Sequence, residues 1–337
     1  MKLIVTGGAG FIGSCFIRLA LGEGLAEAIT NIDKLTYAGN LENLQPVAAH
    51  PGYHFEHADI CDETRMLEVF ERVRPDAVVH FAAESHVDRS IHSPAESVRT
   101  NFSGTFSLLE AARRTGVPRF VHISTDEVYG SIPEPGEAGE CDPLRPSSPY
   151  SASKAGSDLL ALSYYTTYKL NVSVTRASNN YGPCQFPEKL IPLMISNAME
   201  GRSLPVYGDG MQIRDWLFVE DHCRAIWTVL NQGGAGEIYN IGGNCSLANL
   251  EVVRRILAAT GRPESLIARV ADRPGHDRRY ALSSRKLTQE TGWEPQVSFE
   301  KGLALTIDWY RNNPAWTERV KSGEYRAFYQ LNYANRK

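Results

Sequence analysis

Short apolar runs alternate with segments of helical periodicity throughout the first half of the chain. The apolar runs predict strands at Leu3–Thr6, Ala28–Ile32, His54–His57, Ala77–Phe81, Phe120–Ser124 and Val172–Arg176. The intervening segments predict helices at Phe11–Leu21, Thr64–Val73, Phe102–Thr115 and Tyr150–Tyr168. Strands that alternate with helices in this way are typical of a parallel sheet covered on both faces. We therefore predict a doubly wound α/β fold of the Rossmann type.

The pattern changes after Asn179, where prolines at 183, 187, 192 and 205 interrupt it. Predicted strands at Ile213–Val219 and Glu237–Ile241 flank a helical pattern and are expected to rejoin the first sheet. Helical patterns near Leu247–Ala259 and Phe299–Asn312 suit a smaller, mixed α/β C-terminal lobe. We predict a first domain of residues 1–178 plus about 213–243, and a second lobe of residues 179–212 plus 244–330.

Composition removes several classes of function. The chain has 337 residues, of which 42% are hydrophobic and 22% charged, and a net charge of −4. This charge gives no general attraction to nucleic acid or to an anionic membrane, and no run of apolar residues is long enough to span a bilayer. The spacing of the six cysteines suits neither a zinc site nor a disulfide framework. No metal, nucleic-acid or membrane partner is therefore predicted, and free thiols favour a reducing, cytoplasmic compartment.

A glycine-rich turn follows the first predicted strand and opens the first predicted helix. It reads Gly7-Gly8-Ala9-Gly10-Phe11-Ile12-Gly13. Such glycines permit a tight turn and let the backbone approach a pyrophosphate, which then meets the helix N-terminus. A glycine motif alone also fits an ordinary turn.

Asp33 strengthens the case for a dinucleotide site, because it ends the second strand twenty residues after Gly13. A carboxylate at this position hydrogen-bonds the adenosine ribose and repels a 2′-phosphate, so we expect NAD rather than NADP. Lys34 is a counter-signal, since a basic neighbour can accept that phosphate. Asp59 and Ile60 come just past the third strand, where the adenine of a bound cofactor would lie.

The candidate reacting centre begins where the strand Phe120–Ser124 ends, with Thr125, Asp126 and Glu127. Tyr150 and Lys154 follow at a spacing of four, which places them on one face of a helix that starts with Ser148 and Pro149. A lysine ammonium stabilises a nearby phenolate, so Lys154 is expected to lower the pKa of Tyr150. A Tyr and Lys at this spacing are common on surface helices, but here a dinucleotide motif precedes them. The set therefore predicts acid–base chemistry linked to hydride transfer.

At this point nearly the whole chain resembles the extended short-chain dehydrogenase/reductase superfamily, and within it the dTDP-glucose 4,6-dehydratases. The matching segments are Thr-Gly-Gly-Ala-Gly-Phe-Ile-Gly at 6–13, Asp-Lys-Leu-Thr-Tyr-Ala-Gly-Asn at 33–40, Ala-Ala-Glu-Ser-His-Val-Asp-Arg-Ser at 82–90, Ser-Thr-Asp-Glu-Val-Tyr-Gly at 124–130, Ser-Asn-Asn-Tyr-Gly-Pro at 178–183, Pro-Glu-Lys-Leu-Ile-Pro at 187–192 and Arg-Pro-Gly-His-Asp at 273–277. Sugar-nucleotide 4-epimerases are similar overall but lack the acidic pair.

The resemblance implies a reaction in three stages. Tyr150, assisted by Lys154 and Thr125, would remove the proton of the sugar's 4-hydroxyl as hydride passes to NAD. Glu127 would then take the proton from carbon 5, and Asp126 would protonate the departing 6-hydroxyl. Hydride returns to carbon 6, so NAD is a bound, regenerated cofactor. An adjacent acid and base need environments that separate their pKa values.

The resemblance also implies binding residues. Cofactor contacts fall on Gly7, Gly10, Phe11, Ile12, Gly13, Asp33, Lys34, Leu35, Thr36, Asp59, Ile60, Phe81, Ala82, Ala83, Ser85, Thr100, Tyr150, Lys154 and Asn180. Contacts with the nucleotide-sugar substrate fall on Ser85, Thr125, Asn179, Lys189, Leu190, Pro205, Tyr207, Arg214, Asn249, Asp272, Arg273 and His276. Arg214 and Arg273 suit the diphosphate, because guanidinium groups match phosphate oxygens. The alternative for both is an ordinary surface or ion-paired arginine. A water-facing side chain is the alternative for Lys189.

Several alternatives remain open from the residues. A uridine nucleotide differs from a thymidine nucleotide by one methyl group, which distinguishes substrates only weakly. A 4-epimerase or decarboxylase would share the cofactor machinery, and a non-catalytic dinucleotide-binding regulator would keep the fold alone. The loop at residues 131–148 is given no function. The helices at 102–115 and 150–168 suit the interface of a homodimer, and packing on the sheet explains the same apolar stripes.

Overall fold

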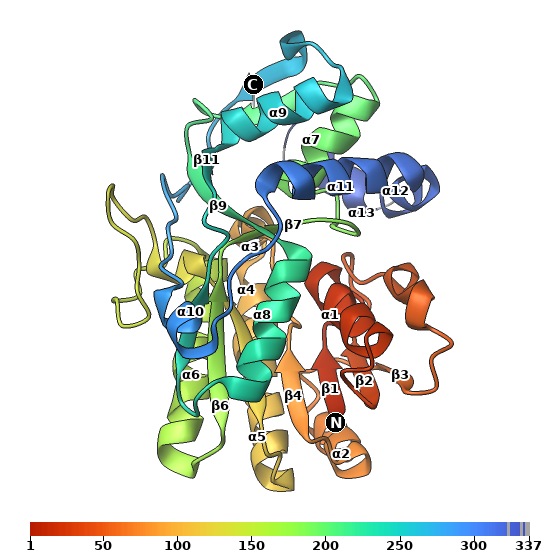
Figure 1. Ribbon diagram of the computed structural model, residues 1–337, viewed down its shortest axis with the longest axis vertical. Coiled ribbons are helices and arrows are strands. Elements are labelled where there is room, and N and C mark those ends of the chain that lie inside the picture. Colours follow the sequence, from red (N-terminus) through yellow and green to blue (C-terminus); the bar gives the residue numbers. More distant parts are fainter. Residues whose placement is uncertain (322–323, 331–332, 334–337) are drawn as a thin grey trace.

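The computed structural model describes residues 1–321, 324–330 and 333. A seven-stranded sheet lies at the centre of the larger part of the molecule (Figure 1). Its strand order is β10-β6-β5-β4-β1-β2-β3, and every neighbouring pair is parallel. The strands are β1 (Lys2–Thr6), β2 (Ala28–Asp33), β3 (Tyr53–His57), β4 (Ala77–His80), β5 (Phe120–Thr125), β6 (Val172–Ala177) and β10 (Ile238–Ile241). The predicted Rossmann-type α/β fold is confirmed.

Helices cover both faces of this sheet. The helices of this part of the chain are α1 (Phe11–Gly22), α2 (Glu63–Val73), α3 (Val87–His92), α4 (Pro94–Val98), α5 (Thr105–Thr115), α6 (Pro149–Tyr168), α8 (Val219–Gln232) and α10 (Arg285–Thr291). Leu3 and Val5 of β1 share one hydrophobic core with α1 and α8, whereas Ile4 belongs to a second core with α2, α5 and α6. Alternate residues of a strand point to opposite faces, so burial on both faces explains why these strands are continuously apolar.

The second lobe lies beyond the carboxyl ends of the strands (Figure 1). It holds a three-stranded sheet of order β11-β9-β7 and a parallel pair of β12 and β8. The strands are β7 (Asn179–Tyr181), β8 (Leu204–Tyr207), β9 (Ile213–Phe218), β11 (Ser246–Ala248) and β12 (Ile267–Val270). Around them pack α7 (Leu190–Met199), α9 (Asn249–Thr260), α11 (Phe299–Asn312), α12 (Pro314–Val320) and α13 (Glu324–Tyr329).

One of the two late strands does not rejoin the first sheet as expected. β10 pairs with β6, but β9 pairs with β7 and β11 in the smaller sheet. The apolar pattern identified a buried strand, and a pattern of burial carries no information about which sheet supplies the hydrogen bonds. The division of the chain into two domains stays a prediction, and its second part includes residues 322–323, which lie outside the described residues.

Candidate active site

The glycine turn between β1 and α1 is held close against the end of β4. Gly7 has a φ of +70°, and a Cβ there would lie 2.6 Å from the backbone nitrogen of Ala82. A Cβ on Gly13 would lie 2.4 Å from the carbonyl oxygen of Gly7. Gly10 caps α1 without a side chain, so the first turn of the helix keeps backbone N–H groups that no side-chain cap occupies. The turn therefore has the close packing and the open helix N-terminus of a phosphate-binding loop.

Asp33 closes β2 and reaches back to this turn. Its two carboxylate oxygens accept the N–H groups of Ala9 at 2.9 Å and Leu35 at 2.8 Å. Burial raises the pKa of this carboxyl, and the two backbone hydrogen bonds oppose that rise. Leu35, with a φ of +55°, supplies a backbone N–H to Asp33 and does not itself line the cavity described below.

Lys34 is engaged by a neighbour. Its Nζ lies 2.9 Å from Oδ2 of Asp59, and Arg99 approaches the same oxygen at 3.0 Å. Burial alone would raise the pKa of Asp59, but the hydrogen bond from Lys34 and the other contacts lower it to about 2. The ammonium that complicated the choice between NAD and NADP is thus committed to an ion pair.

A cavity of about 340 Å³ opens along the carboxyl ends of the parallel strands. Its size falls in the usual range of small-molecule sites. All five predicted catalytic residues line it, as do all predicted cofactor residues apart from Leu35. Of the predicted substrate residues, it brings together Ser85, Thr125, Asn179, Lys189 and Leu190. Nζ of Lys189 donates to the carbonyl oxygen of Ser85 at 2.5 Å, so the alternative of a water-facing lysine is wrong.

The two carboxylates after β5 lie in different surroundings. Thr125 Oγ1 caps the turn at Asp126–Tyr129 by accepting the Glu127 N–H at 3.3 Å, and it donates to Oδ1 of Asp126 at 3.2 Å. Asp126 is buried, and its Oδ2 has no hydrogen-bond partner among the described residues. Burial, followed by the charge of Glu127, raises the pKa of Asp126 well above its ordinary value. Glu127 is less buried and lies 3.5 Å from the hydroxyl of Tyr280. Asp126 is therefore suited to donate a proton and Glu127 to accept one.

The helix α6 carries Tyr150 and Lys154 into the cavity wall. Ser148 caps it and exchanges reciprocal hydrogen bonds with Ser151, and Pro149 occupies the first turn, as predicted. Nζ of Lys154 donates to the carbonyl oxygen of Ile123 at 2.7 Å. Burial lowers the pKa of Lys154 to about 8.

The expected lowering of the Tyr150 pKa is wrong for the protein without bound ligands. Burial, and then repulsion by Glu127, raise the pKa of Tyr150. Spacing on a helix showed that Lys154 lies one turn away, but it could not show how much water the fold removes from the phenol. Desolvation and the charge of Glu127 both penalise the phenolate, and they outweigh the hydrogen bond with Thr125 that favours it.

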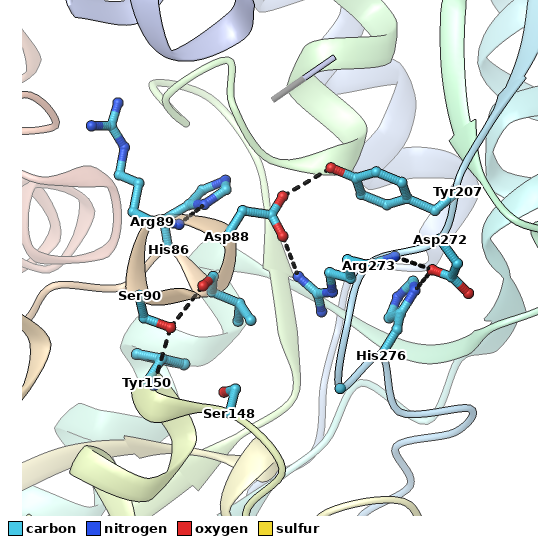
Figure 2. Close-up of polar contacts among 12 residues, drawn as sticks. His86, Asp88, Arg89, Ser90, Ser148, Tyr150, Tyr207, Asp272, Arg273 and His276 are labelled. Atoms are coloured by element: carbon cyan, nitrogen blue, oxygen red, sulfur yellow. Dashed lines mark hydrogen bonds and ion pairs between the residues drawn. The ribbon is translucent and has the colours of Figure 1, made fainter. Parts of the chain in front are cut away.

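The remaining predicted substrate residues lie in the second lobe, outside the cavity lining. They are Pro205, Tyr207, Arg214, Asn249, Asp272, Arg273 and His276. Figure 2 shows His276 beside Asp272, with 2.5 Å between Nδ1 and Oδ1. Burial and then Arg273 lower the pKa of His276 to about 4, so it is neutral near pH 7. Arg214 is buried over the ring of Tyr280, 4.2 Å from its centroid, and donates to the carbonyl oxygens of Ile213 and Asp277.

Some residues that line the cavity were missed from the sequence, among them Glu84, Glu188 and His222. Nδ1 of His222 lies 2.8 Å from Oδ1 of Asn180, while its Nε2 has no partner among the described residues. Burial lowers the pKa of this imidazole to about 3. A signal was available, because His222 follows the predicted strand that ends near Val219, and polar residues just past strand ends are candidates for a site.

Comparison with known proteins assigns the family. The family model described as GDP-mannose 4,6 dehydratase matches residues 4–306. The dTDP-glucose 4,6-dehydratase of Neisseria meningitidis serogroup B is 54% identical over 96% of this chain and 97% of that protein. The enzyme of the same name from Shigella flexneri is 51% identical over the full length of both chains.

A solved structure gives the same result. The dTDP-glucose 4,6-dehydratase DesIV of Streptomyces venezuelae, crystallised with NAD and TDP bound, is 52% identical and superposes with a TM-score of 0.93. The match covers 95% of this chain and 100% of that one. The fold, the cavity and these similarities together show that the chain belongs to the GDP-mannose 4,6-dehydratase family, and within it to the dTDP-glucose 4,6-dehydratases.

Proposed function

We propose that the chain converts dTDP-glucose to dTDP-4-keto-6-deoxyglucose and water, with NAD as a tightly bound cofactor that each turnover regenerates. The observation that carries this proposal is the acidic pair in the cavity wall beside Tyr150 and Lys154. Asp126 is buried and its pKa is raised, while Glu127 is more accessible. Besides the group that serves the 4-hydroxyl, a dehydration needs an acid for the 6-hydroxyl and a base for carbon 5, whereas an epimerisation at carbon 4 needs neither of these two.

The cavity fits a dinucleotide. The open N-terminus of α1 suits the pyrophosphate, and Asp33 at the end of β2 suits the ribose hydroxyls. Asp59, Ile60 and the Phe81–Ala83 segment would bound the adenine side, and Thr100 and Asn180 are further contacts. When bound, NAD supplies a reversible hydride acceptor.

The residues of the chain supply the proton transfers. Tyr150 would take the proton of the 4-hydroxyl, assisted by Thr125. Because burial raises the pKa of the phenol, this step needs a positive charge nearby, and Lys154 is placed one turn along α6 to supply it.

Oxidation at carbon 4 makes the hydrogen on carbon 5 acidic. Glu127 would then remove that proton, and Asp126 would deliver its own proton to the 6-hydroxyl, which leaves as water. Hydride return to carbon 6 and proton return to carbon 5 complete the product without net oxidation. The two carboxyl groups thus require opposite protonation states at the start of the step, and their unequal burial favours that assignment.

Further parts of the proposal concern binding and assembly. Ser85, Asn179, Lys189 and Leu190 would contact the sugar nucleotide from the cavity, and the predicted second-lobe residues would hold the nucleoside diphosphate. We also propose a homodimer, because Val98, Phe102, Leu159 and Tyr168 expose apolar surface on α4, on α6 and on the helical turn that follows α4.

Among the described residues, no helix is long and apolar enough to cross a membrane. The six cysteines are free thiols, which supports a reducing, cytoplasmic location.

The test is turnover of dTDP-glucose by the purified protein, followed by product mass and by NADH absorbance. Loss of one water without net NADH supports the dehydratase. An unchanged mass would overturn it in favour of an epimerase, and faster turnover of UDP-glucose under the same conditions would overturn the choice of thymidine nucleotide.

A further inference from the structure

Asp88 belongs to a helix of the first lobe, and its side chain contacts the second lobe. This helix is α3, which follows the Ala82–Ser85 segment that lines the cavity, and the Asp88 side chain is only 3% exposed. One carboxylate oxygen accepts the hydroxyl of Tyr207 at 2.9 Å, and the other lies 3.3 Å from Nη1 of Arg273 (Figure 2). Each oxygen therefore fixes a different side chain of the second lobe.

The charge on Asp88 matters because it acts on two nearby basic side chains, Arg273 and Lys189. Arg273 and Arg214 are close enough to disfavour each other's charge, and Lys189 is affected by Arg273 in the same way. Burial opposes the charged form of Arg273, and Asp88 is the first of the carboxylates that favour it. A desolvated guanidinium with a carboxylate partner stays charged and keeps one geometry.

The ion pair with Asp88 leaves one N–H donor of the Arg273 guanidinium without a hydrogen-bond partner among the described residues. Asp88 contacts Nη1, whereas Nε of Arg273 is buried without a hydrogen-bond partner among the described residues. A buried, unpaired donor is costly unless an acceptor arrives. The oxygens of a diphosphate are acceptors that match guanidinium donors.

The same short helix also contacts the catalytic helix. Oγ of Ser90, two residues after Asp88, accepts the N–H of Tyr150 at 3.2 Å and donates to the carbonyl oxygen of Val87 at 2.7 Å. Figure 2 shows Ser90 and Asp88 projecting from α3 toward Tyr150 and Arg273 respectively. One rigid turn of helix thus links the group that holds the nucleotide to the group that reacts with the sugar.

We propose that Asp88 is a positioning residue that orients Arg273 and Tyr207 for the nucleoside diphosphate of the substrate, and that α3 thereby sets the distance between the diphosphate and Tyr150. The proposal rests on the proposed function, since it assumes a dTDP-sugar in this site. Asp88 touches no reacting atom and acts through the side chains that it holds.

The test is the Asp88→Asn variant, which keeps the shape of the side chain and removes its charge. We expect dTDP binding, measured by calorimetry, to weaken by about tenfold or more, because Arg273 loses the partner that orients it. The KM for dTDP-glucose should rise by a similar factor while kcat falls by less than about threefold, and NAD binding should not change. Asp209→Asn is the matched control, because Asp209 also pairs with an arginine, Arg278, but on the exposed surface.

A double-mutant cycle separates positioning from a purely structural role. If Asp88 acts mainly through Arg273, then Asp88→Asn should weaken dTDP binding several-fold less in an Arg273→Ala background than in the wild type, and any effect that remains in that background comes from Tyr207. Full additivity would overturn the proposal. Tighter dTDP binding by Asp88→Asn would also overturn it, because Asp88 would then only repel the anionic ligand.

A second variant covers the case in which Asp88→Asn does not fold. Asp88→Glu keeps the charge and moves the carboxylate by one methylene, so dTDP binding should still weaken by about fivefold. Wild-type affinity in that variant would overturn the proposal. The outcome for the proposed function is separate, since it depends on whether the wild-type chain dehydrates dTDP-glucose at all.

Discussion

The carboxyl ends of the main-sheet strands and the cluster of Asp88, Tyr207 and Arg273 between α3 and the second lobe differ in how their buried polar groups are paired. At the sheet edge, Asp126 has an oxygen without a partner, and Lys154 is buried with a lowered pKa. In the cluster, Asp88 is paired with both Arg273 and Tyr207. Burial without an ion-pair partner shifts pKa values and suits proton transfer, whereas an ion pair holds charge and geometry and suits binding. We therefore propose that the strand ends carry out the proton transfers and that the Asp88 cluster serves binding.

The largest expected effect is on the base. Glu127→Gln should slow dehydration by about 10²–10⁴-fold, because the amide cannot take the carbon-5 proton. Oxidation at carbon 4 does not need Glu127, so reduced cofactor should accumulate in a single turnover, visible as NADH absorbance. Glu137→Gln, in an exposed part of the 131–148 loop, is the control. Full dehydration activity in Glu127→Gln would remove Glu127 from the mechanism.

The next effect concerns the stability cost of the buried lysine. The pKa of Lys154 is lowered from 10.5 to about 8, so the unfolded chain binds the proton more tightly than the folded one. The free energy of unfolding of the wild type, relative to Lys154→Met, should rise by about 3 kcal/mol as the pH rises from about 8 to about 10.5. Urea titrations of both proteins across this range measure it. A flat difference would mean that Lys154 is not desolvated.

Asp126 should show the opposite sign at lower pH. Its pKa is raised in the folded chain, so its contribution to stability is fully present below the ordinary value of 3.8 and is lost as the pH rises. Relative to Asp126→Asn, the wild type should therefore lose unfolding free energy as the pH rises above the ordinary value of about 3.8. Paired urea titrations test this, and a flat difference would show that Asp126 ionises as an ordinary surface carboxyl.

The smallest effect is expected where a charge is already paired near the surface. Lys34 is 47% exposed and bound to Asp59, so this ion pair contributes no more than about 1 kcal/mol. Lys34→Ala should change NAD affinity by less than about threefold and leave the preference for NAD over NADP intact. Calorimetric titration with both dinucleotides checks this. Selective loss of NADP binding would show that the lysine reaches a 2′-phosphate after all.

The sequence predicted the first half of the molecule better than the second, for a physical reason. Glycine turns, strand ends and the Tyr150–Lys154 spacing are local features, which can be predicted from neighbouring residues in the sequence. The partners of Asp88 are not, because Arg273 lies 185 residues away and Tyr207 lies 119 residues away. The pairing of β9 with the smaller sheet was missed for the same reason.

Electrostatics were the other gap. The direction of the Tyr150 pKa was predicted wrongly because a neighbour's charge can be inferred from spacing, whereas desolvation depends on everything packed around the phenol. The proposed chemistry requires different surroundings for Asp126 and Glu127, but their unequal burial could be seen only in the folded structure.

The strand order carries a consequence for synthesis on the ribosome. β6 ends at Ala177, and β10, which covers its open edge, begins only at Ile238. Until those later residues emerge, the nascent chain presents an unpaired, apolar strand edge, the surface most prone to pair with another chain. We therefore expect chains truncated between β6 and β10 to aggregate, and the full-length protein to be most vulnerable to mispairing during the interval in which that segment is still being translated.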